Sequence, residues 1–181
     1  MDKLLGKFRK KYEEAMIPVG RFLGKLGFSP NIFSILSVVA GALCLWFFYS
    51  KNLIIGAFLI ISTGILDMFD GAIARATGKI TKFGGVLDHV LDRYVEYLIV
   101  MGIILSGYVD WLWGVLTLFG MIMASFTRAK AESVGGLKNC SVGIAERQEK
   151  LIILIVGTLL SVFYIDVLTY AVILVGVLSH L

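Results

Sequence analysis

Residues 53–75 read LIIGAFLIISTGILDMFDGAIAR, an apolar run that ends in acidic, small and basic residues. Its length is close to the roughly 20 mostly apolar residues that a helix needs to cross the hydrocarbon core of a bilayer. Two aspartates, Asp67 and Asp70, stand near its end. The stretch therefore predicts a membrane-crossing helix that carries two carboxylates close to one membrane surface.

The composition of the whole chain agrees with a membrane protein. Of its 181 residues, 58% are hydrophobic and 17% are charged, and the mean hydropathy is +0.88. A soluble domain has about 45–50% apolar and about 25% charged residues, so the excess apolar residues must face lipid. The two cysteines, Cys44 and Cys140, lie far apart, which indicates neither a disulfide framework nor a zinc motif.

Six apolar segments are predicted to cross the membrane as helices: residues 31–50, 53–74, 84–106, 109–129, 149–165 and 166–181. A single helix over the last two segments would be about 50 Å long, which is too long for one crossing. We therefore expect a tight hairpin between them. The predicted fold class is an all-α membrane protein in which residues 28–181 form one domain of six transmembrane helices.

Residues 1–27 form a separate amphipathic segment before that domain. Apolar side chains recur there at spacings of three and four residues, with lysine and arginine between them; they are Leu4, Leu5, Phe8, Tyr12, Ala15 and Met16. This pattern predicts a helix that lies in the membrane interface. An ordinary solvated run of charges is the alternative interpretation.

The basic residues indicate the orientation in the membrane. If the N-terminus lies in the cytoplasm, most of the lysine and arginine falls in segments on the inner side, within residues 3–25, 75–82 and 128–150. The outer loops then contain only Lys51. The positive-inside rule then places the N-terminus and the aspartates in or near the cytoplasm. Topology also explains the net charge of +4, so nucleic acid is not expected as a partner.

Four aspartates form the central motif. Asp67 and Asp70 are three residues apart and Asp88 and Asp92 are four apart, so each pair shares a face of its helix. Residues 77–82 are expected to reverse the chain and bring the two faces together. Carboxylates at this depth are costly unless they bind cations. Oxygen ligands favour Mg²⁺ or Mn²⁺, and two such ions could clamp a diphosphate.

Small and basic residues accompany the aspartates. Gly71 and Gly84 would let a backbone or a flat nucleotide approach closely, and Arg75 could pair with a phosphate oxygen. Residues 71–74 would also suit a packing seam of small residues between two helices. His89 is one residue out of register with the aspartates, and we interpret it as structural or interfacial.

The full pattern D-x2-D-G-x2-A-R-x8-G-x3-D-x3-D resembles the signature of the CDP-alcohol phosphotransferases. Every fixed position is met, by Asp67, Asp70, Gly71, Ala74, Arg75, Gly84, Asp88 and Asp92. The resemblance implies a homodimer of six-helix protomers, each with a polar cavity open to the cytoplasm. It implies that the four aspartates bind metal and that Asp92 is also the general base. The CDP-contacting residues that it implies are Asp67, Asp70, Gly71, Ala74, Arg75 and Gly84.

The same resemblance implies the reaction. A phosphatidyl-type group, either diacylglycerol phosphate or archaeol phosphate, would move from a CDP-lipid to a small alcohol, and CMP would leave. Nothing in the apolar segments distinguishes CDP-diacylglycerol from CDP-archaeol as the donor. A cation-coupled transporter is the alternative from another class, but it would predict broken helices near the membrane midplane, whereas these aspartates cluster at one end.

A second polar cluster bears on the acceptor. Arg128, Lys130 and Arg147 resemble the residues that line the inositol-phosphate pocket in phosphatidylinositol-phosphate synthases of actinobacteria and their archaeal counterparts. The chain departs from the actinobacterial pattern because Arg128 and Lys130 have exchanged identity and Gln148 replaces a common proline. Inositol 1-phosphate is the expected acceptor, because lysine and arginine together bind phosphate well. Glycerol phosphate is the alternative, serine is less suited, and positive-inside anchoring would explain the same cations without a ligand.

Overall fold

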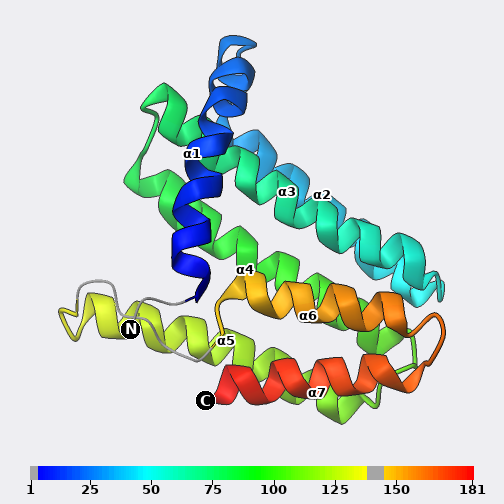
Figure 1. Ribbon diagram of the computed structural model, residues 1–181. Coiled ribbons are helices and arrows are strands. Elements are labelled where there is room, and N and C mark those ends of the chain that lie inside the picture. Colours follow the sequence, from blue (N-terminus) through cyan, green and yellow to red (C-terminus); the bar gives the residue numbers. More distant parts are fainter. Residues whose placement is uncertain (1–3, 138–144) are drawn as a thin grey trace. The chain divides into compact units, whose positions relative to one another are not determined.

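The computed structural model describes residues 4–137 and 145–181, and the regular structure in those ranges is helical. Seven helices follow one another there (Figure 1): α1 (Leu4–Lys25), α2 (Pro30–Tyr49), α3 (Leu53–Thr77), α4 (Lys82–Leu105), α5 (Trp111–Ser133), α6 (Arg147–Leu160) and α7 (Asp166–His180). The predicted helical segments are thus confirmed as helices. A turn over residues 161–165 separates α6 from α7, as the expected hairpin requires.

Within the described ranges, three helices are long and apolar enough to cross a membrane, namely α2, α3 and α5. The first part of α4 is interrupted by Asp88, Asp92 and Arg93. The helices α6 and α7 have 14 and 15 residues, which is short for a full crossing. The all-helical structure with these apolar helices fits a membrane protein.

The chain forms two compact units. The first consists of residues 1–40 and 62–95, and the second of residues 41–61 and 96–181. In the first unit α1 lies close against α3, because Gly20 contacts the backbone of Ala72 and Gly24 contacts the side chain of Thr77. Small residues at such a crossing let two helix backbones approach each other closely.

The turn between α3 and α4 belongs to the first unit. The Thr77 hydroxyl donates a hydrogen bond of 2.7 Å to the Ile73 carbonyl, and Gly78 follows with φ +67°. A residue with positive φ directly after a helix is a common stop signal, and glycine adopts it at little cost. Thr81 then caps α4, because its Oγ1 accepts a hydrogen bond of 2.9 Å from the Gly84 amide. The predicted chain reversal over residues 77–82 is confirmed.

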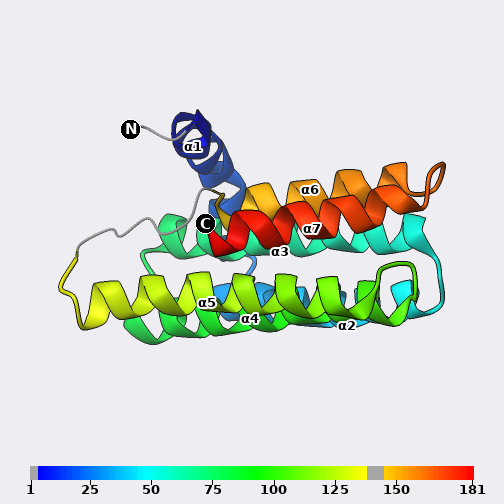
Figure 2. The same cartoon turned by 90° about the horizontal axis from the view of Figure 1, so that it is seen from below.

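In the second unit α7 packs against both α5 and α6. The helices α6 and α7 run side by side as an antiparallel pair (Figure 1 and Figure 2). Gly157 contacts Ala171 at their interface, and Gly176 contacts Thr117 of α5. The Thr117 hydroxyl also donates a hydrogen bond of 2.9 Å to the Val172 carbonyl, so that this buried polar group is satisfied.

Candidate active site

Three carboxylates meet at the α3–α4 turn. Oxygen atoms of Asp67, Asp70 and Asp88 all lie within 4.8 Å of one another. Asp67 and Asp70 come from the last part of α3, and Asp88 comes from the second turn of α4. The faces that helical spacing defines therefore do meet, because the short turn sets the two helix ends beside each other.

A second group of ligand atoms extends along α4. One ligand atom each of Asp88, His89 and Asp92 lies within 4.8 Å of the other two, so that Asp88 belongs to both groups. Asp88 and Asp92 are half-buried and His89 is exposed. His89, which we interpreted from the sequence as structural or interfacial, thus stands within reach of two of the aspartates.

Asp70 is the most enclosed of the four aspartates. Its side chain is buried, and its Oδ2 accepts a hydrogen bond of 2.8 Å from the buried hydroxyl of Ser34 on α2. A hydroxyl that donates to a carboxylate fixes the orientation of that carboxylate. Sequence reasoning missed Ser34. The available signal was the pair Asn31 and Ser34, two polar residues one helical turn apart at the start of an apolar segment.

The donor set fits a divalent metal ion. Three carboxylates this close repel one another when ionised, and a cation between them removes that repulsion. Their oxygen atoms are hard ligands of the kind that Mg²⁺ and Mn²⁺ prefer. The expected Mg²⁺ or Mn²⁺ cofactor is therefore consistent with the residues that the first unit brings together.

A pocket opens beside the aspartates in the same unit. Residues from α2, α3, the turn and α4 line it; they are Pro30, Asn31, Ser34, Asp70, Gly71, Ala74, Lys79, Ile80, Thr81, Gly84, Gly85 and Asp88. Four of the predicted CDP-contacting residues, Asp70, Gly71, Ala74 and Gly84, are among them. Lys79 and Thr81 were missed, although a threonine three residues before Gly84 is a recognisable helix-cap pattern.

The stretch from Gly71 to Ala74 serves two surfaces. Gly71 and Ala74 line the pocket, whereas Ala72 and Ile73 are fully buried, and the Ala72 backbone contacts Gly20 of α1. The packing interpretation of residues 71–74 therefore applies to Ala72 and Ile73, and the two pocket positions, Gly71 and Ala74, stay the predicted nucleotide contacts.

Arg75 lies against the open side of Gly71. A Cβ atom added to Gly71 would stand 3.1 Å from Arg75 Nη1 and 3.5 Å from its Cζ. The guanidinium thus occupies the space that the missing side chain leaves. Because Gly71 lines the pocket, this contact holds the Arg75 charge next to the pocket wall, where a phosphate could meet it.

The predicted acceptor residues lie in the second unit, in two different surroundings. Arg128 is exposed and pairs with Glu132, one turn along α5, at 3.1 Å. Lys130 is also exposed, with its Nζ 5.7 Å from the centre of the Phe126 ring. Residues two positions apart on a helix point about 200° apart. Arg128 and Lys130 therefore leave α5 in different directions.

Arg147, the first residue of α6, is mostly buried. Its side chain is 15% exposed, and its Nε lies 3.5 Å from Oε1 of Glu96 on α4, whose side chain is 2% exposed. Sequence reasoning missed Glu96. The signal was present in the four-residue repeat of Asp88, Asp92 and Glu96 along α4.

Some predictions lie outside the described residues. Cys140 and the neighbouring part of the connection between α5 and α6 fall in residues 138–144, which the structure does not describe. The side chains of Leu4, Leu5, Phe8 and Tyr12 in the amphipathic stripe are also outside the description. Of that stripe, Ala15 is exposed and Met16 is half-buried.

Comparison with known proteins identifies the family. Residues 28–180 match the family model described as CDP-alcohol phosphatidyltransferase. Over 169 residues the chain is 38% identical to the archaetidylinositol phosphate synthase of Pyrococcus horikoshii, which covers 93% of this chain and 89% of that protein.

Solved structures are similar as well. A crystal structure of Mycobacterium tuberculosis phosphatidylinositol phosphate synthase with CDP-DAG bound has a TM-score of 0.79 at 29% identity, covering 91% of this chain and 87% of that one. The same enzyme in complex with manganese and citrate has a TM-score of 0.80 at 29% identity, covering 91% and 83%. With a family match over most of its length and relatives of this similarity, the chain belongs to the CDP-alcohol phosphatidyltransferase family and is an enzyme.

Proposed function

We propose that this enzyme transfers a phosphatidyl-type group from a CDP-lipid to inositol 1-phosphate and releases CMP. The observation that carries the proposal is the cluster of Asp67, Asp70 and Asp88 beside a pocket lined by Gly71, Ala74 and Gly84. The relatives support the acceptor, because both a similar archaeal protein and a similar mycobacterial one are named as inositol-phosphate lipid synthases.

Asp67, Asp70, Asp88 and Asp92 would hold the Mg²⁺ or Mn²⁺, with two ions as the expected number. Bound there, divalent ions would supply positive charge to the diphosphate of the donor and to the departing CMP. Ser34 orients Asp70 by its hydrogen bond, so that one ligand is already positioned before the substrate arrives.

The chain's own residues account for binding the nucleotide and moving the proton. Gly71, Ala74 and Gly84 line the pocket that would take the CDP group, and Arg75, whose guanidinium lies against Gly71, provides a cation for a phosphate oxygen. Asp92 takes the proton from the acceptor hydroxyl, as a general base within hydrogen-bond reach can do. The new bond joins that oxygen to the lipid-side phosphorus. The bond from this phosphorus to the CMP oxygen breaks.

For the acceptor, we propose that Arg128, Lys130 and Arg147 bind the phosphate group of inositol 1-phosphate. Arginine presents a planar fork of donors that matches phosphate, and lysine adds a compact charge. Glycerol phosphate carries the same group and remains the alternative acceptor. The donor would be CDP-diacylglycerol or CDP-archaeol.

The membrane arrangement is part of the proposal. Residues 28–181 would form the six-helix domain with all of α2 to α7 in the membrane, and residues 1–27 would lie in the interface through α1. The N-terminus and the aspartates would face the cytoplasm, supported by the distribution of lysine and arginine. The homodimer implied by the family resemblance completes it. Labelling of single cysteines in intact cells at positions 3, 51 and 79 would test the sidedness, with only position 51 accessible from outside.

The deciding experiment measures CMP release by the purified protein with Mg²⁺ or Mn²⁺ and a CDP-lipid. Inositol 1-phosphate, glycerol 3-phosphate, inositol and serine are offered separately. We expect turnover with inositol 1-phosphate, none after chelation of the metal, and recovery when the metal is restored. Turnover with glycerol 3-phosphate alone would refute the proposed acceptor and retain the reaction.

Two aspartate variants make the assay specific to the site. Asp92→Asn should abolish CMP release, because the amide accepts no proton from the acceptor. Asp166→Asn is the matched control, since Asp166 is an exposed aspartate in the first turn of α7. A normal rate in Asp92→Asn would exclude Asp92 as the base.

A further inference from the structure

The buried pair of Glu96 and Arg147 lies in the second unit, and the proposed reaction gives a role to Arg147 but none to Glu96. The Glu96 carboxylate is 2% exposed, the Arg147 side chain is 15% exposed, and Oε1 and Nε are 3.5 Å apart. A carboxylate withdrawn from water to this extent is costly unless a cation compensates its charge. Arg147 supplies such a cation.

Stability alone is a weak explanation for this pair. Removing two charges from water costs about as much free energy as their attraction returns, so a buried ion pair adds little to the free energy of unfolding. What such a pair does provide is a fixed direction for both side chains, since the charge of each limits the conformations of the other. The pair therefore fixes the orientation of the Arg147 guanidinium.

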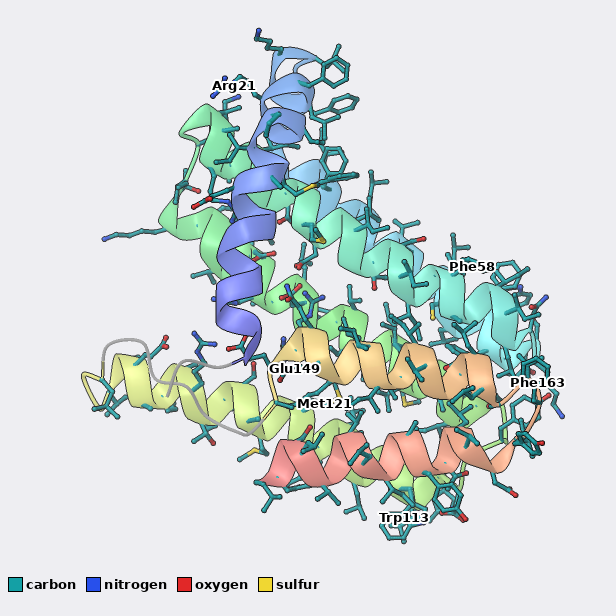
Figure 3. All side chains as sticks on the ribbon, in the orientation of Figure 1. Arg21, Phe58, Trp113, Met121, Glu149 and Phe163 are labelled. Carbon is teal, nitrogen blue, oxygen red and sulfur yellow. The ribbon has the colours of Figure 1, made fainter. Side chains whose placement is uncertain are left out.

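The backbone of Arg147 is also fixed. Arg147 opens α6, and the residue before it, Glu146, donates its backbone amide to Oε2 of Glu149 at 2.7 Å. This bond belongs to a capping box, which fixes where and in which direction a helix begins. Glu149 stands at that end of α6 in Figure 3. Arg147 is thus positioned through its main chain by Glu149 and through its Nε edge by Glu96.

The guanidinium is a planar fork with five N–H donors, and a carboxylate at one edge sets the plane of the whole group. We propose that Glu96 is a positioning residue for the acceptor, which holds the Arg147 guanidinium in the orientation that binds the acceptor's phosphate. This inference rests on the proposed function in one respect, namely that Arg147 binds that phosphate. Glu96 itself touches neither substrate.

A double-mutant cycle on KM tests the inference in the purified full-length enzyme. Glu96→Gln keeps the shape of the side chain and removes its charge. We expect it to raise KM for inositol 1-phosphate about tenfold, the size expected for one charge-assisted hydrogen bond. The KM for the CDP-lipid should stay within about twofold, because only the acceptor contact is disturbed. In an Arg147→Ala background, Glu96→Gln should add less than about twofold.

Thr158→Val is the matched control. Thr158 is a fully buried polar residue of α6, the helix that carries Arg147, and its hydroxyl donates a hydrogen bond to the Leu154 carbonyl at 2.7 Å. Loss of this buried polar group should leave KM for inositol 1-phosphate unchanged. A comparable rise in KM in Thr158→Val would mean that general disturbance of α6 explains the effect of Glu96→Gln and would overturn the inference.

Other outcomes also decide between the alternatives. If the effects of Glu96→Gln and Arg147→Ala on KM for the acceptor multiply in the double variant, Glu96 does not act through Arg147, and the inference is overturned. Equal rises in KM for both substrates would likewise show that the pair has only a structural role. If Glu96→Gln does not fold, Glu96→Asp keeps the charge and shifts it by one methylene, and it should also raise KM for the acceptor alone. If the wild-type enzyme uses glycerol 3-phosphate instead, the proposed acceptor fails, and the same cycle measured with that phosphate still tests Glu96.

Discussion

The aspartate cluster and the basic residues of α5 and α6 differ in how the chain assembles them. Asp67, Asp70 and Asp88 come from two helix ends joined by a short turn, and their oxygen atoms lie within 4.8 Å of one another. The basic residues come from two helices with a longer connection between them. One of them, Arg147, is held in a buried ion pair, whereas Arg128 and Lys130 are exposed.

Helical spacing is enough to build a site only when the helices are joined by a short turn, as α3 and α4 are. Between Asp70 and Asp88 the geometry follows from two helix periods and one turn. For Arg128 and Arg147, the sequence gives the charge of each residue, but helical spacing does not identify the carboxylate that pairs with Arg147. The aspartates should therefore respond to mutation as one unit, and the basic residues should respond unequally.

After Asp92→Asn, which should abolish CMP release, the largest effect is expected for Asp88→Asn, since Asp88 belongs to both groups of ligand atoms. Loss of its charge should lower the rate of CMP release by about 10²- to 10³-fold, the range seen when a charge-stabilising group is removed from a transition state. Asp166→Asn serves again as control, with an unchanged rate. Activity within tenfold of wild type in Asp88→Asn would contradict the expectation that the aspartates act together.

A smaller effect should separate the basic residues from one another. Arg147→Ala should raise KM for inositol 1-phosphate by about 10- to 100-fold, because it removes a mostly buried cation beside the buried Glu96 carboxylate. Arg128→Ala should raise it by only about two- to fivefold, since exposed ion pairs contribute little. Steady-state kinetics with varied acceptor measures both. Equal rises in KM for the two variants would show that the burial of these arginines does not determine how much each contributes to acceptor binding.

The next effect concerns the support of one metal ligand. Ser34→Ala removes the hydrogen bond to Asp70 and should weaken activation by Mn²⁺ about tenfold, as loss of an outer partner of a metal ligand commonly does. Ser37→Ala is a close control. Ser37 is also a buried serine of α2, but its hydroxyl contacts the Thr63 carbonyl at 3.5 Å. Titration of activity with Mn²⁺ should shift for Ser34→Ala alone.

The smallest effect should come from the cap of α4. Thr81→Ala removes the bond to the Gly84 amide and should lower stability by about 1 kcal/mol, the usual cost of a lost cap. Asn52→Ala removes a comparable bond to the Ile55 amide at the start of α3. Thermal unfolding in detergent should shift similarly in both. A rise in KM for the CDP-lipid is expected only for Thr81→Ala, because Thr81 lines the pocket.

Sequence reasoning predicted the helices, the chain reversal and the meeting of the aspartates, because all three depend on the periodicity of single helices and on one short turn. It missed Ser34, whose partner Asp70 is 36 residues away, because no local pattern encodes that contact. It missed Glu96 for a similar reason, since a glutamate in an apolar helix indicates a buried charge and does not name the arginine that compensates it. The burial that separates Arg147 from Arg128 depends on packing, which only the structure supplies.

The different surroundings of residues 71–74, two lining the pocket and two buried, have a consequence for mutagenesis of this stretch. Ala72 and Ile73 are buried among neighbours of the folded chain, whereas Gly71 and Ala74 line the pocket, so substitutions at adjacent positions should have different consequences. A saturation library over these four positions should split into two phenotypes. Changes at 72 and 73 should reduce the yield of membrane-inserted protein, and changes at 71 and 74 should give normal yield with slow turnover. To alter the nucleotide preference of the enzyme, Gly71 and Ala74 would therefore be varied, and Ala72 and Ile73 would be left unchanged.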